Sequence, residues 1–189
     1  MNSNSALLCD ASRSQLLVID IQERLTKAMP EKALKNVTHH TNLLLQASEL
    51  LDIPVIRTEQ YPKGLGATLP EVAENFTDKT ITLEKTCFSC LGADGFEQQV
   101  DIKNRNQIIL TGMESHVCVL QTAMQLHALG AQVFIAGDAI CARHKHNHKN
   151  AIQRMSQAGI VISNTESILF EWLRDAQHEH FKTISASLR

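Results

Sequence analysis

The chain has 189 residues, with 18 lysines and arginines against 20 aspartates and glutamates and a formal net charge of −2. This length suits a single domain, residues 1–189, with a sizeable core. The balanced charge leaves no broad basic field, so composition offers no case for nucleic acid or a membrane as partner and leaves a small-molecule substrate open. No apolar stretch is long enough to span a membrane, and residues 1–15 lack a signal-peptide pattern, so we expect a cytoplasmic protein.

Apolar runs that predict strands alternate along the chain with amphipathic runs that predict helices. The strand-like runs lie at about 15–20, 54–59, 80–84, 107–112, 132–137 and 160–163. Gly130 and Gly159 are typical of helix ends just before a strand. Right-handed crossovers place the helices on both faces of such a sheet. The sequence therefore predicts an α/β, three-layer, Rossmann-like fold with a six-stranded, mostly parallel sheet.

Three chemically complementary residues follow three of these strands. Asp20 closes the run LLVID, Lys85 closes TITLEK, and Cys118 opens a helix-like run soon after IILTG. In an open α/β sheet the carboxyl ends of the strands border the ligand crevice. A helix start and a nearby lysine both favour a thiolate, so we expect them to lower the pKa of Cys118.

Each of these residues also has a plainer interpretation. Cys118 alone fits a buried core cysteine, Asp20 fits a cap on the turn that follows it, and Lys85 fits an edge residue whose ammonium reaches solvent. Their occurrence together, at the ends of three strands, favours a reactive site.

The five cysteines are an odd number scattered through a chain of ordinary size, which is typical of reduced thiols. Cys87 and Cys90 form a C-x-x-C pair. A zinc site would need further ligands, and a redox pair would need a helix start. We expect these two residues to line or back the site beside Lys85.

Five segments give the chain a resemblance to a known family. They are LLVIDIQERL from Leu16, PVIRTEQYPKGLG from Pro54, LEKTCFSC from Leu83, GMESHVCVLQTA from Gly112 and GDAICAR from Gly137. In order and spacing they resemble the isochorismatase-like hydrolase superfamily, over nearly the whole chain. The resemblance implies a hydrolase with the catalytic triad Asp20, Lys85 and Cys118.

The same resemblance implies how an oxyanion would be held. The donors would be the backbone N–H groups of Cys118 and Glu114, with a cis peptide between Met113 and Glu114. Asp20 would take the thiol proton and return it to the leaving amine. Lys85 would keep Asp20 ionised.

Five residues within or beside these segments are candidates for substrate binding. Tyr61 and Phe88 would supply apolar walls, Gln22 or Gln60 a hydrogen bond, and His116 a further contact. Capping or core roles remain open for each of them.

We expect no cofactor and no metal. Nicotinamidases of this superfamily bind a divalent ion through an aspartate and two histidines after the second strand, whereas residues 57–70 contain no histidine. His144, His146 and His148 form a possible chelating cluster, but their neighbouring lysines favour a solvated loop or a helix start.

The leading interpretation is a metal-independent cysteine hydrolase that cleaves a C–N bond of a small amide or carbamoyl compound through an acyl-thioester. One alternative is vinyl-ether hydrolysis, as in isochorismatase, which needs no thiol. Another is a non-catalytic binding or thiol-sensing module. Family members usually assemble, so we expect a homo-oligomer. Trp172 is either an interface anchor or packed within its own subunit.

Overall fold

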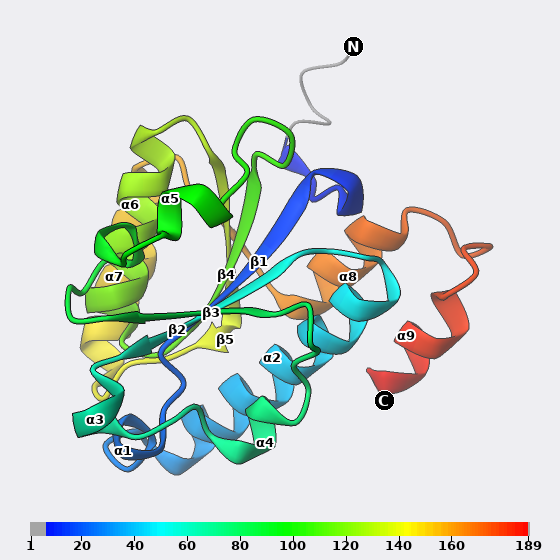
Figure 1. Ribbon diagram of the computed structural model, residues 1–189. Coiled ribbons are helices and arrows are strands. Elements are labelled where there is room, and N and C mark those ends of the chain that lie inside the picture. The colour runs from blue at the N-terminus through cyan, green and yellow to red at the C-terminus, as the bar shows by residue number, and fades with distance from the viewer. Residues whose placement is uncertain (1–6, 189) are drawn as a thin grey trace.

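The computed structural model describes residues 7–188 and contains one sheet of six parallel strands in the order β3-β2-β1-β4-β5-β6 (Figure 1). The strands are β1 (Ser14–Ile19), β2 (Val55–Gln60), β3 (Ile81–Lys85), β4 (Gln107–Gly112), β5 (Gln132–Ile140) and β6 (Val161–Ser163). Strand order reverses between β1 and β4, which makes the carboxyl ends of these strands a switch point. The predicted α/β fold is confirmed, and every strand pair is parallel.

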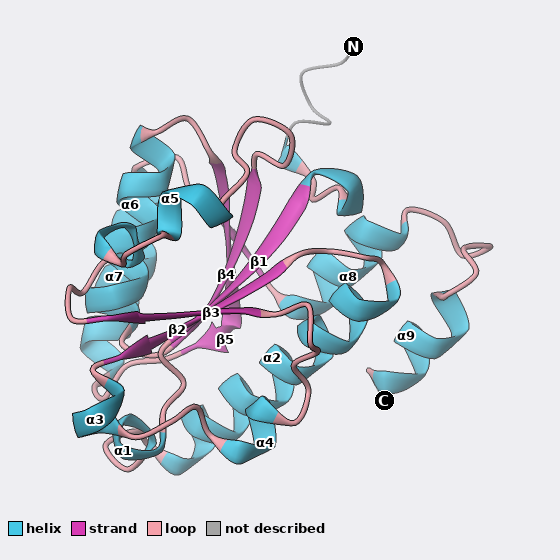
Figure 2. Cartoon of the chain, viewed as in Figure 1, coloured by secondary structure: helices cyan, strands magenta, loops and turns pink. Residues whose placement is uncertain are grey.

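Helices cover both faces of the sheet (Figure 2). One apolar core, under α2 (Glu31–Leu50), α8 (Thr165–Leu173) and α9 (Phe181–Ser187), fills one face. The second core lies under α5 (Phe96–Gln99), α6 (Leu120–Ala128) and α7 (Lys145–Gln157). Three short helices, α1 (Glu23–Thr26), α3 (Pro62–Leu65) and α4 (Pro70–Ala73), lie in the connections around β2.

The central strand β1 is buried on both faces. Leu16 and Val18 pack into the core under α2, whereas Leu17 and Ile19 pack into the core under α6. Successive side chains of a strand point to opposite faces, so a strand covered on both sides needs an unbroken apolar run. This is why LLVI precedes Asp20 and ends at the edge of the sheet.

The C-terminal segment packs on the face that α2 covers. Trp172 of α8 is 3% exposed and donates its indole N–H to Ser14 Oγ at 2.9 Å. Trp172 therefore packs within its own subunit, and its possible role as an interface anchor is excluded. Ile184 of α9 is buried against the same core. Arg189 of the tail, and residues 1–6 of the N-terminal stretch, lie outside the described residues.

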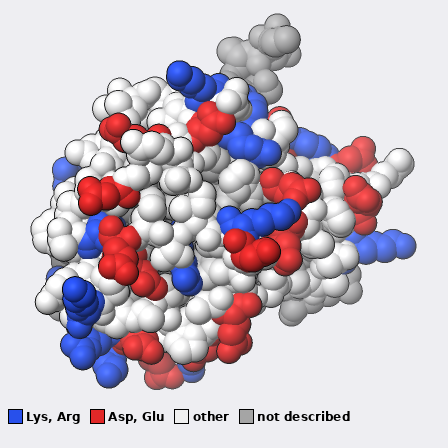
Figure 3. Space-filling model, viewed as in Figure 1, with Lys and Arg blue, Asp and Glu red and all other residues white. Residues whose placement is uncertain are grey.

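Acidic and basic side chains are interspersed over the face of the molecule shown in Figure 3. No helix within residues 7–188 combines the length and apolarity that crossing a membrane requires.

Candidate active site

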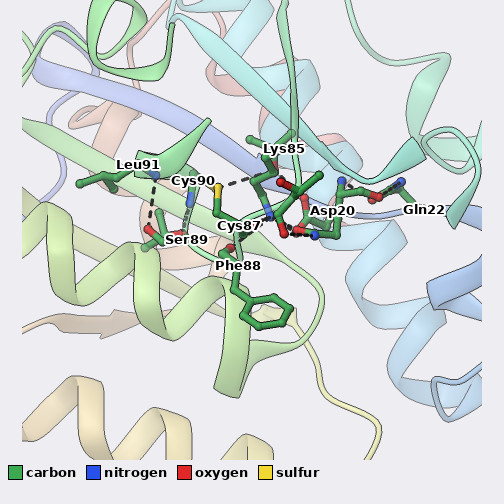
Figure 4. A network of polar contacts seen from close by, with 12 residues as sticks. Asp20, Gln22, Lys85, Cys87, Phe88, Ser89, Cys90 and Leu91 are labelled. Atoms are coloured by element: carbon green, nitrogen blue, oxygen red, sulfur yellow. Dashed lines mark hydrogen bonds and ion pairs between the residues drawn. The ribbon is translucent and has the colours of Figure 1, made fainter. Parts of the chain in front are cut away.

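Asp20 and Lys85 form a buried ion pair at the carboxyl ends of β1 and β3. Lys85 Nζ lies 2.6 Å from Asp20 Oδ2, and neither side chain is more than 1% exposed (Figure 4). This burial excludes a solvent-exposed ammonium for Lys85. Asp20 is not a helix cap either, because Gln22 occupies the N-cap position of α1.

Lys85 is held by more than its carboxylate partner. Its Nζ also donates to Gln60 Oε1 at 2.8 Å, to the Phe88 carbonyl at 3.1 Å and to the Cys87 carbonyl at 3.3 Å. Burial, the largest single effect, lowers the pKa of Lys85, but the charge of Asp20 and the smaller effects of Cys118 and Cys90 together raise it above its usual value. The ammonium therefore stays charged at neutral pH.

Cys118 lies in η4 (Ser115–Val119), a single π-helical turn that continues directly into α6. The sequence prediction of a helix start at this position is confirmed. Gly112 ends β4 at φ 136°, and a Cβ there would lie 2.1 Å from the Ile19 carbonyl oxygen. Only glycine allows this close approach of β4 to β1, which places η4 beside Asp20.

The Cys118 thiol is almost fully buried and lies close enough to Asp20 for the carboxylate to affect its pKa. Burial, followed by the charge of Asp20, raises the pKa of Cys118 above its usual range, and the smaller opposing effect of Lys85 does not reverse this. The expectation that Lys85 and the helix start lower this pKa is therefore wrong for the resting site. Sequence reasoning weighed the cation but did not weigh the burial. The resting group is a protonated thiol beside a carboxylate.

Glu114 links β4 to η4 through a left-handed conformation, with φ 55° and ψ 59°. There is no cis peptide between residues 7 and 188, so the expected cis bond between Met113 and Glu114 is wrong, and the positive φ of Glu114 makes the turn instead. The neighbouring N–H groups of Met113 and Ser115 donate to the carbonyls of Ile19 and Cys141. Within the described residues the Glu114 N–H has no backbone acceptor.

The two glutamines near the ion pair have structural partners. Gln22 is fully buried, and its amide nitrogen donates to the carbonyls of Gln60 and Gly66 at 3.0 and 2.7 Å. Its oxygen accepts the Gln60 backbone N–H at 2.7 Å. With both of its donors engaged, Gln22 holds the end of β2, and we withdraw it as a substrate contact. Gln60 positions Lys85 and donates to the Thr86 carbonyl.

The two aromatic candidates lie at the exposed rim of the site. Tyr61 and Phe88 are each about half exposed, at 54% and 55%. Tyr61 borders a hollow of about 380 Å³ beside Lys85, which Asp94 borders as well. The Phe88 ring extends away from the polar network around Lys85 (Figure 4).

A further polar network that sequence reasoning missed surrounds Glu114. Its Oε1 lies 2.5 Å from Arg143 Nε, and its Oε2 lies 3.2 Å from His116 Nδ1. The other ring nitrogen of His116 lies 3.2 Å from Asn147 Nδ2. Through Arg143 and Asn147, the network connects the residues after β5 and the start of α7 to η4. The GDAICAR motif, which ends in Arg143, was the signal that could have revealed it.

The histidine cluster marks the start of α7. His144 is its N-cap residue, and His146 and His148 lie in its first turn. Burial lowers the pKa of His148. No group of three or more histidine, cysteine or acidic residues in the described chain is arranged to hold a metal ion. Metal-independence itself stays a prediction.

A family model described as the isochorismatase domain matches residues 14–167. The chain belongs to the isochorismatase family. Family members are hydrolases. Isochorismatase domain-containing protein 2 from Danio rerio is 36% identical over 93% of this chain and 86% of its own length. A secreted isochorismatase effector, Isc1, from Phytophthora sojae is 34% identical over 93% of this chain and 84% of its own length.

Solved structures of other proteins have the same fold. The MAR1 ribonuclease of Caenorhabditis elegans is 31% identical, with a TM-score of 0.89 over 96% of this chain and 92% of that chain. YcaC from Escherichia coli, described as an octameric hydrolase of unknown specificity, is 23% identical, with a TM-score of 0.85 over 96% of this chain and 90% of that chain. At that identity, YcaC bears on the fold alone.

Proposed function

We propose that this isochorismatase-family chain is a cysteine hydrolase that cleaves a C–N bond of a small amide or carbamoyl compound through Cys118, Asp20 and Lys85. The observation that carries the proposal is the buried Cys118 thiol beside Asp20, a carboxylate that Lys85 holds at 2.6 Å. A thiol paired with a base that a third group orients is the arrangement of an activated nucleophile.

The reaction begins with transfer of the thiol proton to Asp20 as the sulfur attacks the carbonyl carbon. The carbonyl oxygen becomes an oxyanion, and the C–N bond breaks as Asp20 returns the proton to the departing nitrogen. Water then hydrolyses the thioester to a carboxylic or carbamic acid and restores the thiol. Because the resting pKa of Cys118 is raised, this proton transfer accompanies attack rather than preceding it.

The oxyanion is assigned to the backbone N–H groups of Glu114 and Cys118. Support comes from the Glu114 N–H, which lacks a backbone acceptor within residues 7–188, and from the position of Cys118 in the first helical turn, where N–H groups lack intrahelical partners. Donors fixed in advance stabilise the charge that develops at the transition state. Tyr61, Phe88, Gln60 and His116 remain candidates for contacts with the rest of the substrate.

The proposal is tested by screening the purified protein against small primary amides and carbamoyl compounds for release of ammonia. Cys118→Ala is the matched control, and it should leave the fold intact and reduce turnover to background. Covalent capture of an acyl group on Cys118, detected by mass spectrometry, supports the thioester. Turnover that survives in Cys118→Ala would reject the nucleophile assignment.

Vinyl-ether hydrolysis is a second candidate, because many relatives are named after isochorismatase and Asp20 can supply a proton. Pyruvate release from isochorismate by both the native protein and Cys118→Ala would establish it. Because the similar Caenorhabditis elegans protein is named a ribonuclease, the screen also includes an RNA substrate. A thiol-sensing role is disfavoured, because sensor cysteines have a low pKa and are exposed, whereas Cys118 is neither.

The proposal includes assembly into a homo-oligomer. It is supported by the exposed rings of Tyr61 and Phe88 and by Phe170, which is 40% exposed next to Phe181. Light scattering at micromolar concentration tests it, and a monomer there would contradict it. A cytoplasmic location stays a prediction.

A further inference from the structure

Thr58 lies within the segment PVIRTEQYPKGLG, where sequence reasoning assigned it no role, and it holds Asp20 at two points. It lies in β2 beside the end of β1 and is 1% exposed. Its hydroxyl donates to Asp20 Oδ1 at 2.8 Å, and its carbonyl accepts the Asp20 backbone N–H at 3.2 Å. One residue therefore fixes both the backbone and the side chain of the proposed base.

These two hydrogen bonds with Thr58 are important because Asp20 has an unusual backbone conformation. Its φ of 53° lies in the left-handed region, which costs free energy for a residue with a Cβ and persists only when neighbours hold it. The two carboxylate oxygens also have different partners, Thr58 on Oδ1 and Lys85 on Oδ2. Together these contacts define the orientation in which the carboxylate meets the Cys118 thiol.

The direction of the Thr58 hydroxyl is set by a third group. Cys90 Sγ lies 3.7 Å from Thr58 Oγ1, within the range of a hydrogen bond from a thiol. Burial raises the pKa of Cys90 to about 12, so it remains a protonated donor at neutral pH. Because Cys90 donates a hydrogen bond to the Thr58 oxygen, the Thr58 hydroxyl is free to donate its own hydrogen bond to Asp20.

We infer that Thr58 is a positioning residue of the active site, which orients Asp20 and partly compensates its charge where it faces the Cys118 thiol. The role of Thr58 in turnover rests on the proposed function. Its effect on the ionisation of the Cys118 thiol, exerted through Asp20, can be measured without turnover.

The test is the pH dependence of Cys118 alkylation by iodoacetamide, followed at the level of the Cys118 peptide by mass spectrometry. Thr58→Val keeps the shape of the side chain and removes the hydroxyl. It leaves the carboxylate charge less compensated, so the alkylation midpoint should rise by about one pH unit. Thr58→Ser keeps the hydroxyl and should restore the native midpoint. On any substrate turned over, Thr58→Val should lower kcat about tenfold with little change in KM.

Thr111→Val is the matched control. Thr111 is equally buried on β4, which pairs with the other side of β1, and its hydroxyl has no partner within the described residues. This variant should leave the midpoint unchanged. If Thr58→Val does not fold, as judged by circular dichroism, Thr58→Ala replaces it with the same expected shift.

The outcomes separate this inference from the proposed function. An unchanged midpoint in folded Thr58→Val, or an equal shift in Thr111→Val, overturns the positioning role. Absence of turnover on every substrate rejects the hydrolase proposal, and a Thr58-dependent midpoint would still stand.

Discussion

A protonated, buried thiol is a poor nucleophile on its own, so the reactivity of Cys118 depends on the carboxylate next to it. Asp20 has two opposing effects. Its charge raises the pKa of Cys118, which lowers the thiolate fraction at rest, while its oxygen is placed to accept the proton during attack. The two effects can be separated by one substitution.

Asp20→Asn should make Cys118 easier to ionise and yet abolish turnover. Removal of the charge takes away the second largest cause of the raised pKa, so alkylation by iodoacetamide should begin at lower pH. Turnover should fall by about 10²- to 10⁴-fold because the proton acceptor is lost. Peptide mass spectrometry measures the first quantity, with buried Cys9 as an internal reference. A midpoint that moves to higher pH would contradict the assigned cause.

Lys85→Met should destabilise the fold because it leaves the Asp20 carboxylate buried without its cation. Removal of one partner of a buried ion pair costs about 3–5 kcal/mol. The free energy of unfolding from urea titration at neutral pH is the measurement. Lys79→Met is the control, because the Lys79–Asp52 pair is more than 80% exposed on both sides and its loss should cost under about 1 kcal/mol. Equal losses in the two variants would show that Lys85 does not stabilise the buried site.

At the level of elements, periodicity located the strands well, because β1 and β4 contain continuous apolar runs and β3 alternates apolar and polar residues. The predicted ends of β4 and β6 coincide with the observed ends, and those of β1, β2 and β3 lie one residue away. β5 instead continues three residues further, to Ile140, through Gly137 and Asp138. These two residues interrupt the apolar run, and pairing with β4 across a shift in register extends the strand beyond them.

The site was predicted less completely than the fold, for a physical reason. Which residue types end which strands is visible in the sequence, and this located Asp20, Lys85 and Cys118. The partners of a buried polar group are not visible, because they come from distant segments. Gln22 bonds to backbone groups 38 and 44 positions away, and Thr58 bonds to a side chain 38 positions away.

The turn from β4 into η4 is the element that depends most on one glycine. Gly112→Ala would place a Cβ 2.1 Å from the Ile19 carbonyl at φ 136°, so β4 and β1 must separate. We expect a loss of unfolding free energy of at least about 3 kcal/mol, with turnover reduced even where the fold persists. Gly130→Ala is the control, because its φ is 87° but no atom lies within 4 Å of the added Cβ. It should cost about 1 kcal/mol. Equal costs, measured by thermal and urea unfolding, would mean that the contact with β1 is unimportant.

Over the whole molecule, the proposed chemistry gathers at one edge of the sheet. β1 supplies the base, β3 the cation, and the turn after β4 the thiol, while the ends of β2 and β5 hold these groups in place through Thr58 and Arg143. In a parallel sheet all of these ends share one edge. The fold thus brings the proposed base and the thiol together although Asp20 and Cys118 are 98 positions apart in the chain.

This edge offers side chains for acid–base and nucleophilic chemistry, and the residues after β2 lack the histidines of a nicotinamidase site. We therefore expect activity to survive prolonged dialysis against EDTA, with metal content followed by mass spectrometry of the same samples. A zinc hydrolase treated in parallel should lose its activity. If turnover is instead lost and then restored by zinc, iron or manganese, the prediction is wrong. The variant His146→Ala/His148→Ala then identifies the source, because a metal held at the start of α7 would be lost with these side chains.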